Sequence, residues 1–194
     1  MIVIAATKNK GKIREIQSIL GELGITVQSL SEAGIDCDAE ENGKTFEENA
    51  LIKARCAAAL TDKAVIADDS GLCVDCLDGR PGIYSARYAG ENATDADRIK
   101  KLLSEIGDSK NRDAKFVCAA AMVYPDGREI VVSGEVKGRI INEMRGDNGF
   151  GYDPVFVPDE LDGRTFAEAS DEEKNTISHR KRAFCELCEK IKKI

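Results

Sequence analysis

The side chains that a phosphate site requires are concentrated in one segment near the start of the chain, Thr7-Lys8-Asn9-Lys10-Gly11-Lys12. This segment follows an apolar run and precedes an amphipathic helical pattern. Backbone N–H groups at a helix start favour anions, and lysines add positive charge that suits phosphate. The formal net charge of the chain is -7, so the three lysines do not simply reflect a basic composition. We predict that residues 7–12 bind a triphosphate. The Walker spacing is absent, and a solvated charged surface is the alternative interpretation.

Carboxylates that could hold a metal ion stand at two places in the sequence. Glu40 and Glu41 lie in an acidic, turn-rich loop, and Asp68 and Asp69 follow the apolar residues 64–67. Magnesium prefers oxygen ligands and normally uses one or two carboxylates with water and substrate phosphates. Hydrolysis of a phosphoanhydride needs such an ion and a carboxylate that takes a proton from water. We therefore predict a Mg²⁺ site, with Mn²⁺ as a substitute.

The local structure at the two aspartates has two alternatives. If the strand ends at Ala67, the next four residues, Asp68-Asp69-Ser70-Gly71, are a polar turn. If the strand continues through both aspartates, its side chains alternate and only one carboxylate faces the site. In either case the Ser70 hydroxyl could donate to a phosphate.

Two further segments contain side chains suited to a purine. In Gly149-Phe150-Gly151-Tyr152-Asp153-Pro154, glycines let the backbone approach a planar ligand, and an aromatic ring can stack on a base. Both aromatic residues could equally belong to the core. Near the end of the chain, Lys174, His179 and Arg180 supply donors that could address a purine carbonyl. His179 is the only histidine in the chain, and a lone histidine is more often a capping or packing residue.

Composition excludes several classes of function. With 194 residues, 42% of them apolar, the chain is long enough for one domain with a proper core. The acidic balance argues against binding to nucleic acid or to an anionic membrane. The sequence contains neither a membrane-span pattern nor a signal-peptide pattern, so we expect a cytoplasmic protein.

Seven cysteines include two C-x-x-C pairs, Cys73 with Cys76 and Cys185 with Cys188. Their wide separation argues against a zinc site, although four thiolates could in principle hold one. Cys188 continues the apolar stripe of the last helix, which favours packing. The odd cysteine total and the absence of an export signal argue against a disulfide framework.

Hydrophobic periodicity predicts the elements that position these residues. Strands and helices alternate at first and a hairpin follows, so we expect an α/β or α+β fold with a mixed sheet flanked by helices. Thr45 and Glu48 form the pattern of a capping box. We expect strands at 2–6, near 27, at 64–67, 114–124, 128–139 and 155–157; helices at 11–23, after 45, after 94 and at 178–194; and loops at 36–43, 79–92 and 146–153.

Taken together, these motifs resemble the inosine/xanthosine triphosphate pyrophosphatases, which remove deaminated purine nucleotides. The resemblance extends over essentially the whole chain and rests on six blocks in order. They are T-K-N-K-G-K, E-E-N-G-K-T-F-E-E-N-A-L-I-K-A, A-D-D-S-G-L, G-R-P-G-I-Y-S-A-R-Y-A-G, G-F-G-Y-D-P and E-K-N-T-I-S-H-R. The resemblance implies an elongated molecule with a central twisted mixed sheet and two lobes with a cleft between them, and it implies a homodimer.

The resemblance also implies a role for individual residues. Asp69 would be the general base and would meet the metal, with Asp68 as a supporting acid. Glu40 would be the metal-binding acid, although the neighbouring Glu41 fits nearly as well. The substrate-binding residues would be Thr7, Asn9, Lys12 and Lys53 for the triphosphate, Ser70 as a further contact, and Phe150, Gly151, Tyr152, Asp153, Lys174, His179 and Arg180 for base and sugar. Cys73 and Cys76 depart from the family, which usually has small aliphatic residues there.

The implied reaction is attack of water on the α-phosphorus of ITP, dITP or XTP, which releases pyrophosphate and a nucleoside monophosphate. Donors such as His179 and Arg180 would pair with the 6-oxygen of these purines and would be left unpaired by adenine, at a cost of about 1–3 kcal/mol. Two alternatives stay open. One is a nucleotide-binding sensor without hydrolysis; the other is a hydrolase for other modified nucleotides or sugar phosphates.

Overall fold

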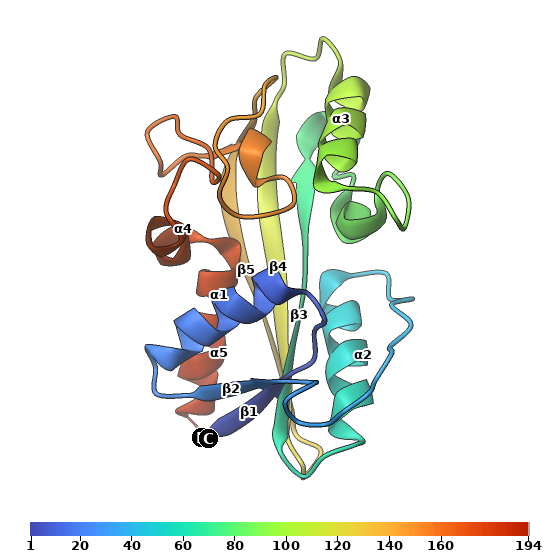
Figure 1. The fold of residues 1–194 in the computed structure, drawn as a ribbon, viewed down its shortest axis with the longest axis vertical. Helices are drawn as coiled ribbons and strands as arrows, with labels where there is room; N and C mark the ends of the chain where they lie inside the picture. Colours follow the sequence, from blue (N-terminus) through green and yellow to red (C-terminus); the bar gives the residue numbers. More distant parts are fainter. Residues whose placement is uncertain (194) are drawn as a thin grey trace. The chain divides into compact units, whose positions relative to one another are not determined.

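Within residues 1–193, which the computed structural model describes, six strands form one sheet. They are β1 (Ile2–Ala5), β2 (Thr26–Ser29), β3 (Ala64–Val74), β4 (Asp113–Val123), β5 (Glu129–Ile140) and β6 (Phe156–Pro158). The strand order is β2-β1-β3-β4-β5-β6. Because β1 pairs in parallel with β2 and β3 while β5 pairs antiparallel with β6, the sheet is mixed. The predicted fold class, a mixed sheet flanked by helices, is confirmed (Figure 1).

The helices lie close to their predicted places. They are α1 (Lys10–Gly21), α2 (Phe46–Ala58), α3 (Asp95–Ile106), α4 (Asp171–Ile177) and α5 (His179–Ile191), with short 3-10 helices η1 (Asp75–Leu77), η2 (Gly82–Arg87) and η3 (Asp153–Val155). The segment 79–92, predicted to be a loop, contains η2. In the described part of the chain, every helix is too short or too polar to cross a membrane.

The chain divides into two compact units. Unit 1 comprises Met1–Asp69, Cys118–Gly134 and His179–Ile194, and unit 2 comprises Ser70–Val117 and Glu135–Ser178. The chain therefore passes from one unit to the other four times: within β3, within β4, within β5 and between α4 and α5. In β3 the boundary falls directly after Asp69, so the two aspartates belong to unit 1 and Ser70 belongs to unit 2.

In unit 1 the sheet is covered on both faces (Figure 1). Helices α1 and α5 pack their apolar stripes on one face, where Ile16, Phe184 and Ile66 belong to one buried cluster. Helix α2 packs its alanines on the other face, where Ala54 and Ala67 belong to a second cluster. Successive strand residues alternate between the two clusters, as the period of a strand requires.

Strand β3 is longer than predicted. The sequence indicated a strand at 64–67 that ends in a polar turn at the aspartates, but the strand runs on to Val74. The turn interpretation is therefore wrong, and Asp68 and Asp69 are buried residues inside a strand. Side chains on both sides of the strand supply cations to the two carboxylates, and this tertiary pairing overrides the low strand propensity of aspartate.

The capping box predicted at α2 forms only in part. Thr45 Oγ1 accepts a hydrogen bond from the Glu48 backbone N–H, as expected. The Glu48 carboxylate, however, accepts from the backbone N–H of Lys44 at 2.6 Å instead of closing the box on Thr45. Complete capping boxes occur instead at α3, between Thr94 and Asp97, and at α4, between Ser170 and Glu173.

The last predicted helix, 178–194, begins as expected but has a neighbour that the sequence analysis missed. Helix α4 ends at Ile177, and Ser178 has extended backbone angles before α5 starts at His179. The sequence signal for α4 is the capping box at Ser170, which was not recognised. Ile194, the predicted end of the last helix, lies outside the described residues.

The predicted hairpin at 125–127 is confirmed. Tyr124 and Arg128 face each other across it, and Gly127 has a φ of +84°, a conformation that favours glycine.

In unit 2, one apolar cluster joins α3 to the strands and to the segment 152–169, and it contains Phe116, Phe156 and Phe166.

The cysteines differ from expectation in one respect. A disulfide joins Cys37 in the acidic loop to Cys56 in α2, with a Cα–Cα distance of 6.3 Å. The sequence analysis argued against a disulfide framework and did not indicate this single bond, because the pairing depends on how the loop packs on the helix. Cys188 is buried in the core of unit 1, which confirms the packing interpretation. Among residues 1–193 no three His, Cys, Asp or Glu side chains gather into a metal cluster.

Close packing of α5 on β5 depends on Gly134. A Cβ atom there would lie 2.5 Å from both the His179 backbone O and the Ala183 backbone N. We predict that Gly134→Ala lowers the free energy of unfolding by about 1–3 kcal/mol, because α5 must move away from the sheet. Urea denaturation measures this change. The matched control is Gly21→Ala at the end of α1, where a Cβ has nothing within 4 Å; a loss of stability as large in the control would contradict the explanation.

Candidate functional site

The segment 7–12 forms the turn from β1 into α1, as predicted. Asn9 is the N-cap of α1: its Oδ1 accepts hydrogen bonds from the backbone N–H groups of Gly11 and Lys12, at 2.9 and 3.2 Å. Thr7 Oγ1 in turn accepts from the Asn9 backbone N–H. The side chains of Thr7 and Asn9, which the sequence analysis assigned to phosphate binding, thus also define the turn. They fix the position in α1 from which the Lys12 side chain extends.

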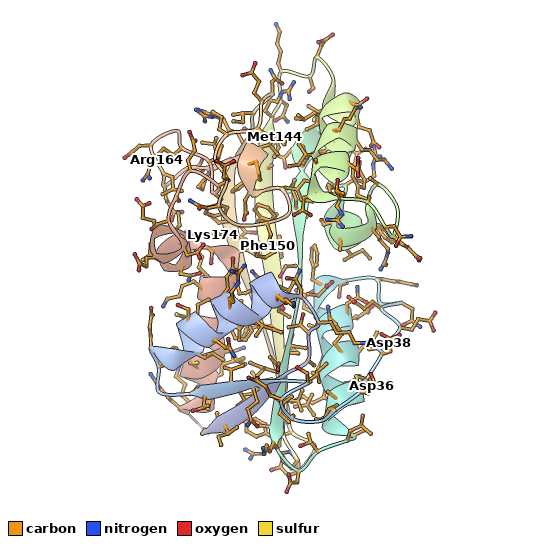
Figure 2. All side chains as sticks on the ribbon, viewed as in Figure 1. Asp36, Asp38, Met144, Phe150, Arg164 and Lys174 are labelled. Atoms are coloured by element: carbon orange, nitrogen blue, oxygen red, sulfur yellow. A yellow bond between two sulfur atoms is a disulfide. The ribbon has the colours of Figure 1, made fainter. Side chains whose placement is uncertain are left out.

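Lys8 and Lys10, together with Thr7, line a groove of about 810 Å³ in unit 1, and the carboxylates of β3 are not part of its lining. Lys8 makes an exposed ion pair at 3.1 Å with Asp38, which Figure 2 labels on the acidic loop. Such an exposed pair is worth little. The prediction that all three lysines serve one triphosphate is therefore best supported for Lys12.

Asp68 is the centre of a buried ion cluster in unit 1. Its Oδ2 accepts from Arg180 Nη2 at 2.9 Å and Nε at 3.2 Å, and it lies 3.1 Å from Lys12 Nζ. Arg180 also pairs with Glu15 of α1, a residue that the sequence analysis did not single out. Cys118 Sγ lies 3.9 Å from the same oxygen.

Arg180 is only 1% exposed, although the resemblance assigned it to the nucleotide base. Burial alone lowers the pKa of its guanidinium, but Asp68 and Glu15 outweigh this effect and raise the pKa above the ordinary value. Arg180 is therefore a permanent cation that joins α5 to β3 and α1. Its geometry supports a role in holding Asp68 and, through Asp68, the ammonium of Lys12.

Asp69 faces the other side of β3, toward α2. Its Oδ1 accepts from Lys53 Nζ at 3.0 Å, and its Oδ2 accepts from Asn49 Nδ2 at 3.3 Å. Burial raises the pKa of Asp69, and the positive charges of Lys53 and Lys12 offset only part of this rise. A buried carboxyl with a raised pKa, held on both oxygens, has the properties of a positioned general base.

Glu41, rather than Glu40, is the loop acid that reaches this group. Lys53 Nζ donates to Glu41 Oε2 at 2.8 Å while it also contacts Asp69. Glu40 is exposed on the loop. Two carboxylates from distant parts of the sequence thus converge on one positive charge. Mg²⁺ normally takes one or two carboxylates from a protein, so this donor set fits the metal, and substrate and water would supply the other ligands.

Asn49 is a site residue that the sequence analysis missed. It is buried in α2, and its Oδ1 accepts from the Gly43 backbone N–H at 2.8 Å while its Nδ2 donates to Asp69. One side chain therefore holds both the end of the acidic loop and the candidate base. A buried asparagine directly after two glutamates in a helix was the available signal, since such a side chain needs partners.

In unit 2 the candidate base-binding residues form a second buried ion pair. Asp153 Oδ2 accepts from Lys174 Nζ at 2.7 Å and from the Phe150 backbone N–H at 2.9 Å. Lys174 is 3% exposed, and its ammonium lies 4.7 Å from the centre of the Phe150 ring. Figure 2 labels Phe150 and Lys174 side by side in this unit.

The other predicted residues of this loop have structural partners. Tyr152 is buried in the core of unit 2 and its hydroxyl donates to the Ser85 backbone O at 2.9 Å. The Gly151 backbone N–H donates to Asp95 at the start of α3. Of the two aromatic residues, Phe150 is half-buried and Tyr152 is buried. Ser70 is half-buried in β3, and His179 is buried at the start of α5.

Comparison with known proteins decides the family. The Ham1 family model matches residues 3–190 of the chain. The chain belongs to the Ham1 family. A dITP/XTP pyrophosphatase of Bacillus licheniformis is 51% identical to it over 187 residues, which cover 95% of each chain. This membership confirms the resemblance found in the sequence.

Solved structures of the Ham1 family agree with this assignment. A Ham1 protein of Staphylococcus aureus has a TM-score of 0.87 and 45% identity, covering 99% of this chain and 98% of that one. A HAM1 protein of Coxiella burnetii has a TM-score of 0.88 and 41% identity, with both chains covered completely. The fold described above is therefore that of the family.

The environment of Asp69 makes a prediction about its titration. In the metal-free protein the carboxyl should titrate above the ordinary value of 3.8, because burial disfavours its charge more than the lysines favour it. A pKa raised by folding favours the folded state at low pH, and this contribution is lost as the pH rises through the folded pKa. Asp69→Asn should therefore gain stability relative to the parent protein with increasing pH.

¹³C NMR of the aspartate side-chain carboxyl groups, recorded as a function of pH with a chelator present, measures the pKa of Asp69. The signal that disappears in Asp69→Asn assigns the resonance. A midpoint below the ordinary aspartate value would contradict the described environment.

Proposed function

We propose that this Ham1 protein hydrolyses deaminated purine nucleoside triphosphates, namely dITP, ITP and XTP, to the monophosphate and pyrophosphate. The relative from Bacillus licheniformis named dITP/XTP pyrophosphatase matches 95% of the chain at 51% identity, and this observation carries the proposal. The geometry of unit 1 supports it, because lysines and carboxylates from three motifs converge there.

Asp69 is the proposed general base. Its carboxylate would take the proton from the water that attacks the α-phosphorus, while Asn49 keeps its second oxygen in place. Lys12, oriented by Asp68, and Lys53 would bind the phosphate oxygens, with Thr7 and Asn9 shaping the turn. These cations would stabilise the charge that pyrophosphate carries as it leaves.

Mg²⁺, with Mn²⁺ as a substitute, is the proposed cofactor. Asp69 and Glu41 would hold it, with the exposed Glu40 next to them on the loop as the alternative ligand. When bound, such an ion neutralises charge on the phosphates and orients the reacting oxygens.

For the purine we propose the residues of unit 2. Phe150 offers a ring for stacking, and Lys174, which its partner Asp153 orients, offers an ammonium that can donate to the 6-oxygen of the base. Adenine presents a donor at this position and would leave the ammonium unpaired. Gly151, Tyr152, His179 and Arg180 are buried or bonded to protein groups, as Lys174 is, and their base contacts stay part of this proposal.

We also propose that the protein acts in the cytoplasm and forms a homodimer. Analytical ultracentrifugation would test the oligomeric state.

Hydrolysis is tested by incubating the protein with Mg²⁺ and a panel of dITP, XTP, dATP, dGTP and modified pyrimidine triphosphates. We expect pyrophosphate, not orthophosphate, to be released, and to be released from dITP and XTP in preference to dATP. Asp69→Asn should lower kcat by roughly 10²–10⁴-fold while triphosphate binding persists. Binding without release of either product would favour the sensor; preference for a modified pyrimidine would favour the other hydrolase. Near-normal turnover by Asp69→Asn would exclude it as the base.

The choice between the two loop acids is tested by a matched pair of amide variants. Because Glu41 shares Lys53 with Asp69, Glu41→Gln should raise the Mg²⁺ concentration needed for half-maximal activity by about tenfold or more, whereas Glu40→Gln should raise it less. Activity titrated with Mg²⁺ measures both shifts. A larger shift for Glu40→Gln would return the metal ligand to Glu40, as the sequence resemblance indicated.

A further inference from the structure

The ammonium group of Lys53 lies between the two carboxylates that would bind the proposed metal ion. Lys53 Nζ is 2.8 Å from Glu41 Oε2 and 3.0 Å from Asp69 Oδ1. The Lys53 side chain is 13% exposed, and the Asp69 side chain is 9% exposed, so little water competes for this contact. The two carboxylates are here called the Glu41–Asp69 pair.

Lys53 stays charged in this environment. Its ammonium lies between two carboxylates, and nearby negative charges favour the charged form of a lysine. A divalent cation that binds the Glu41–Asp69 pair must therefore approach a permanent positive charge that already uses the same two oxygens. At such distances in a partly buried site, this repulsion is large.

The rest of the site is built to keep Asp69 in place when the ammonium leaves. Asn49 holds the second carboxylate oxygen of Asp69, and the same asparagine holds the loop at Gly43. Lys53 itself is attached to α2 by a flexible four-carbon stem, so its ammonium can move without a change in the backbone. The Cys37–Cys56 disulfide further ties the acidic loop to this helix.

The balance of charge gives the reason for such a movement. The ion cluster contains three cationic side chains, Lys12, Lys53 and Arg180, and four carboxylates, Glu15, Glu41, Asp68 and Asp69. With all of them ionised the cluster carries one excess negative charge, which disfavours a polyphosphate. A divalent cation reverses the sign, and the polyphosphate then provides the displaced ammonium with new partners.

We propose that Lys53 occupies the Glu41–Asp69 pair in the free protein as an internal substitute for the metal ion, and that a polyphosphate draws its ammonium away. The divalent cation and the triphosphate consequently bind as a coupled pair, and the free protein holds the metal ion weakly. This inference rests on the proposed function, because it takes a metal-dependent triphosphate as the ligand. Lys53 therefore has two partners in succession: the Glu41–Asp69 pair in the free protein, and the polyphosphate after the ligands bind.

The test measures two affinities of Lys53→Met. Mn²⁺ binding, followed by EPR of the free ion without any phosphate, should become at least about tenfold tighter, because a positive charge is removed from beside two carboxylates. Inorganic tripolyphosphate binding, followed by calorimetry without metal, should become at least about fivefold weaker, because a phosphate partner is lost. A merely structural role of Lys53 would weaken both affinities.

Two variants serve as controls. Lys44→Met removes the same charge from an exposed position on the neighbouring segment, and it should leave both affinities within about twofold because that charge is screened by solvent. Adding Glu41→Gln to Lys53→Met should abolish the gain in Mn²⁺ affinity, since the tighter site is the Glu41–Asp69 pair.

Equal or weaker Mn²⁺ binding by Lys53→Met overturns the inference, and so does a gain that survives the loss of the Glu41 carboxylate. The pyrophosphate assay separates this failure from that of the proposed function. If the parent protein hydrolyses dITP but the two affinities do not shift in opposite directions, only the inference fails. If they shift in opposite directions and dITP is not hydrolysed, only the proposed function fails.

Discussion

Two adjacent carboxylates inside a buried strand are stable only if cations reach both faces of that strand, and unit 1 is organised by this constraint. Asp68 meets Lys12 and Arg180 on the face covered by α1 and α5, and Asp69 meets Lys53 on the face covered by α2. Helices α1, α2 and α5 therefore each contribute a basic side chain to β3. Removing one member of such a cluster leaves a buried charge without compensation, which is far more costly than the net gain from the pair itself.

The same constraint explains why the two aspartates differ in chemistry. Asp68 is surrounded by a guanidinium and an ammonium and serves to orient Lys12. Asp69 has only one close ammonium, an amide and a loop carboxylate nearby, and burial raises its pKa. Neighbours in sequence thus become an orienting acid and a candidate base, because the alternation of a strand sends them into different surroundings.

Unit 2 repeats the principle on a smaller scale. Asp153 and Lys174 form a buried pair, and the Asp153 carboxylate also fixes the backbone of the glycine-rich loop at Phe150. A Cβ atom at Gly149 would lie 2.1 Å from Asp153 Oδ2, and φ there is +75°, so glycine is required for this close approach. In both units a buried carboxylate holds a neighbouring group in place: Asp68 holds the ammonium of Lys12 in unit 1, and Asp153 holds the loop backbone at Phe150 in unit 2.

Local periodicity, capping and motif order can be recognised in the amino-acid sequence. They were enough to predict the order and type of most elements, the turn at residues 7–12, the hairpin at 125–127 and the family. The site is different. The continuation of β3 through the aspartates, the choice of Glu41 for Lys53, the roles of Asn49 and Glu15, the burial of Arg180 and the Cys37–Cys56 disulfide were decided by tertiary structure alone. Most of them depend on contacts between residues that are not neighbours in the sequence. The free energy of burying a charge depends on the partner that the fold brings to it, and local sequence does not specify that partner.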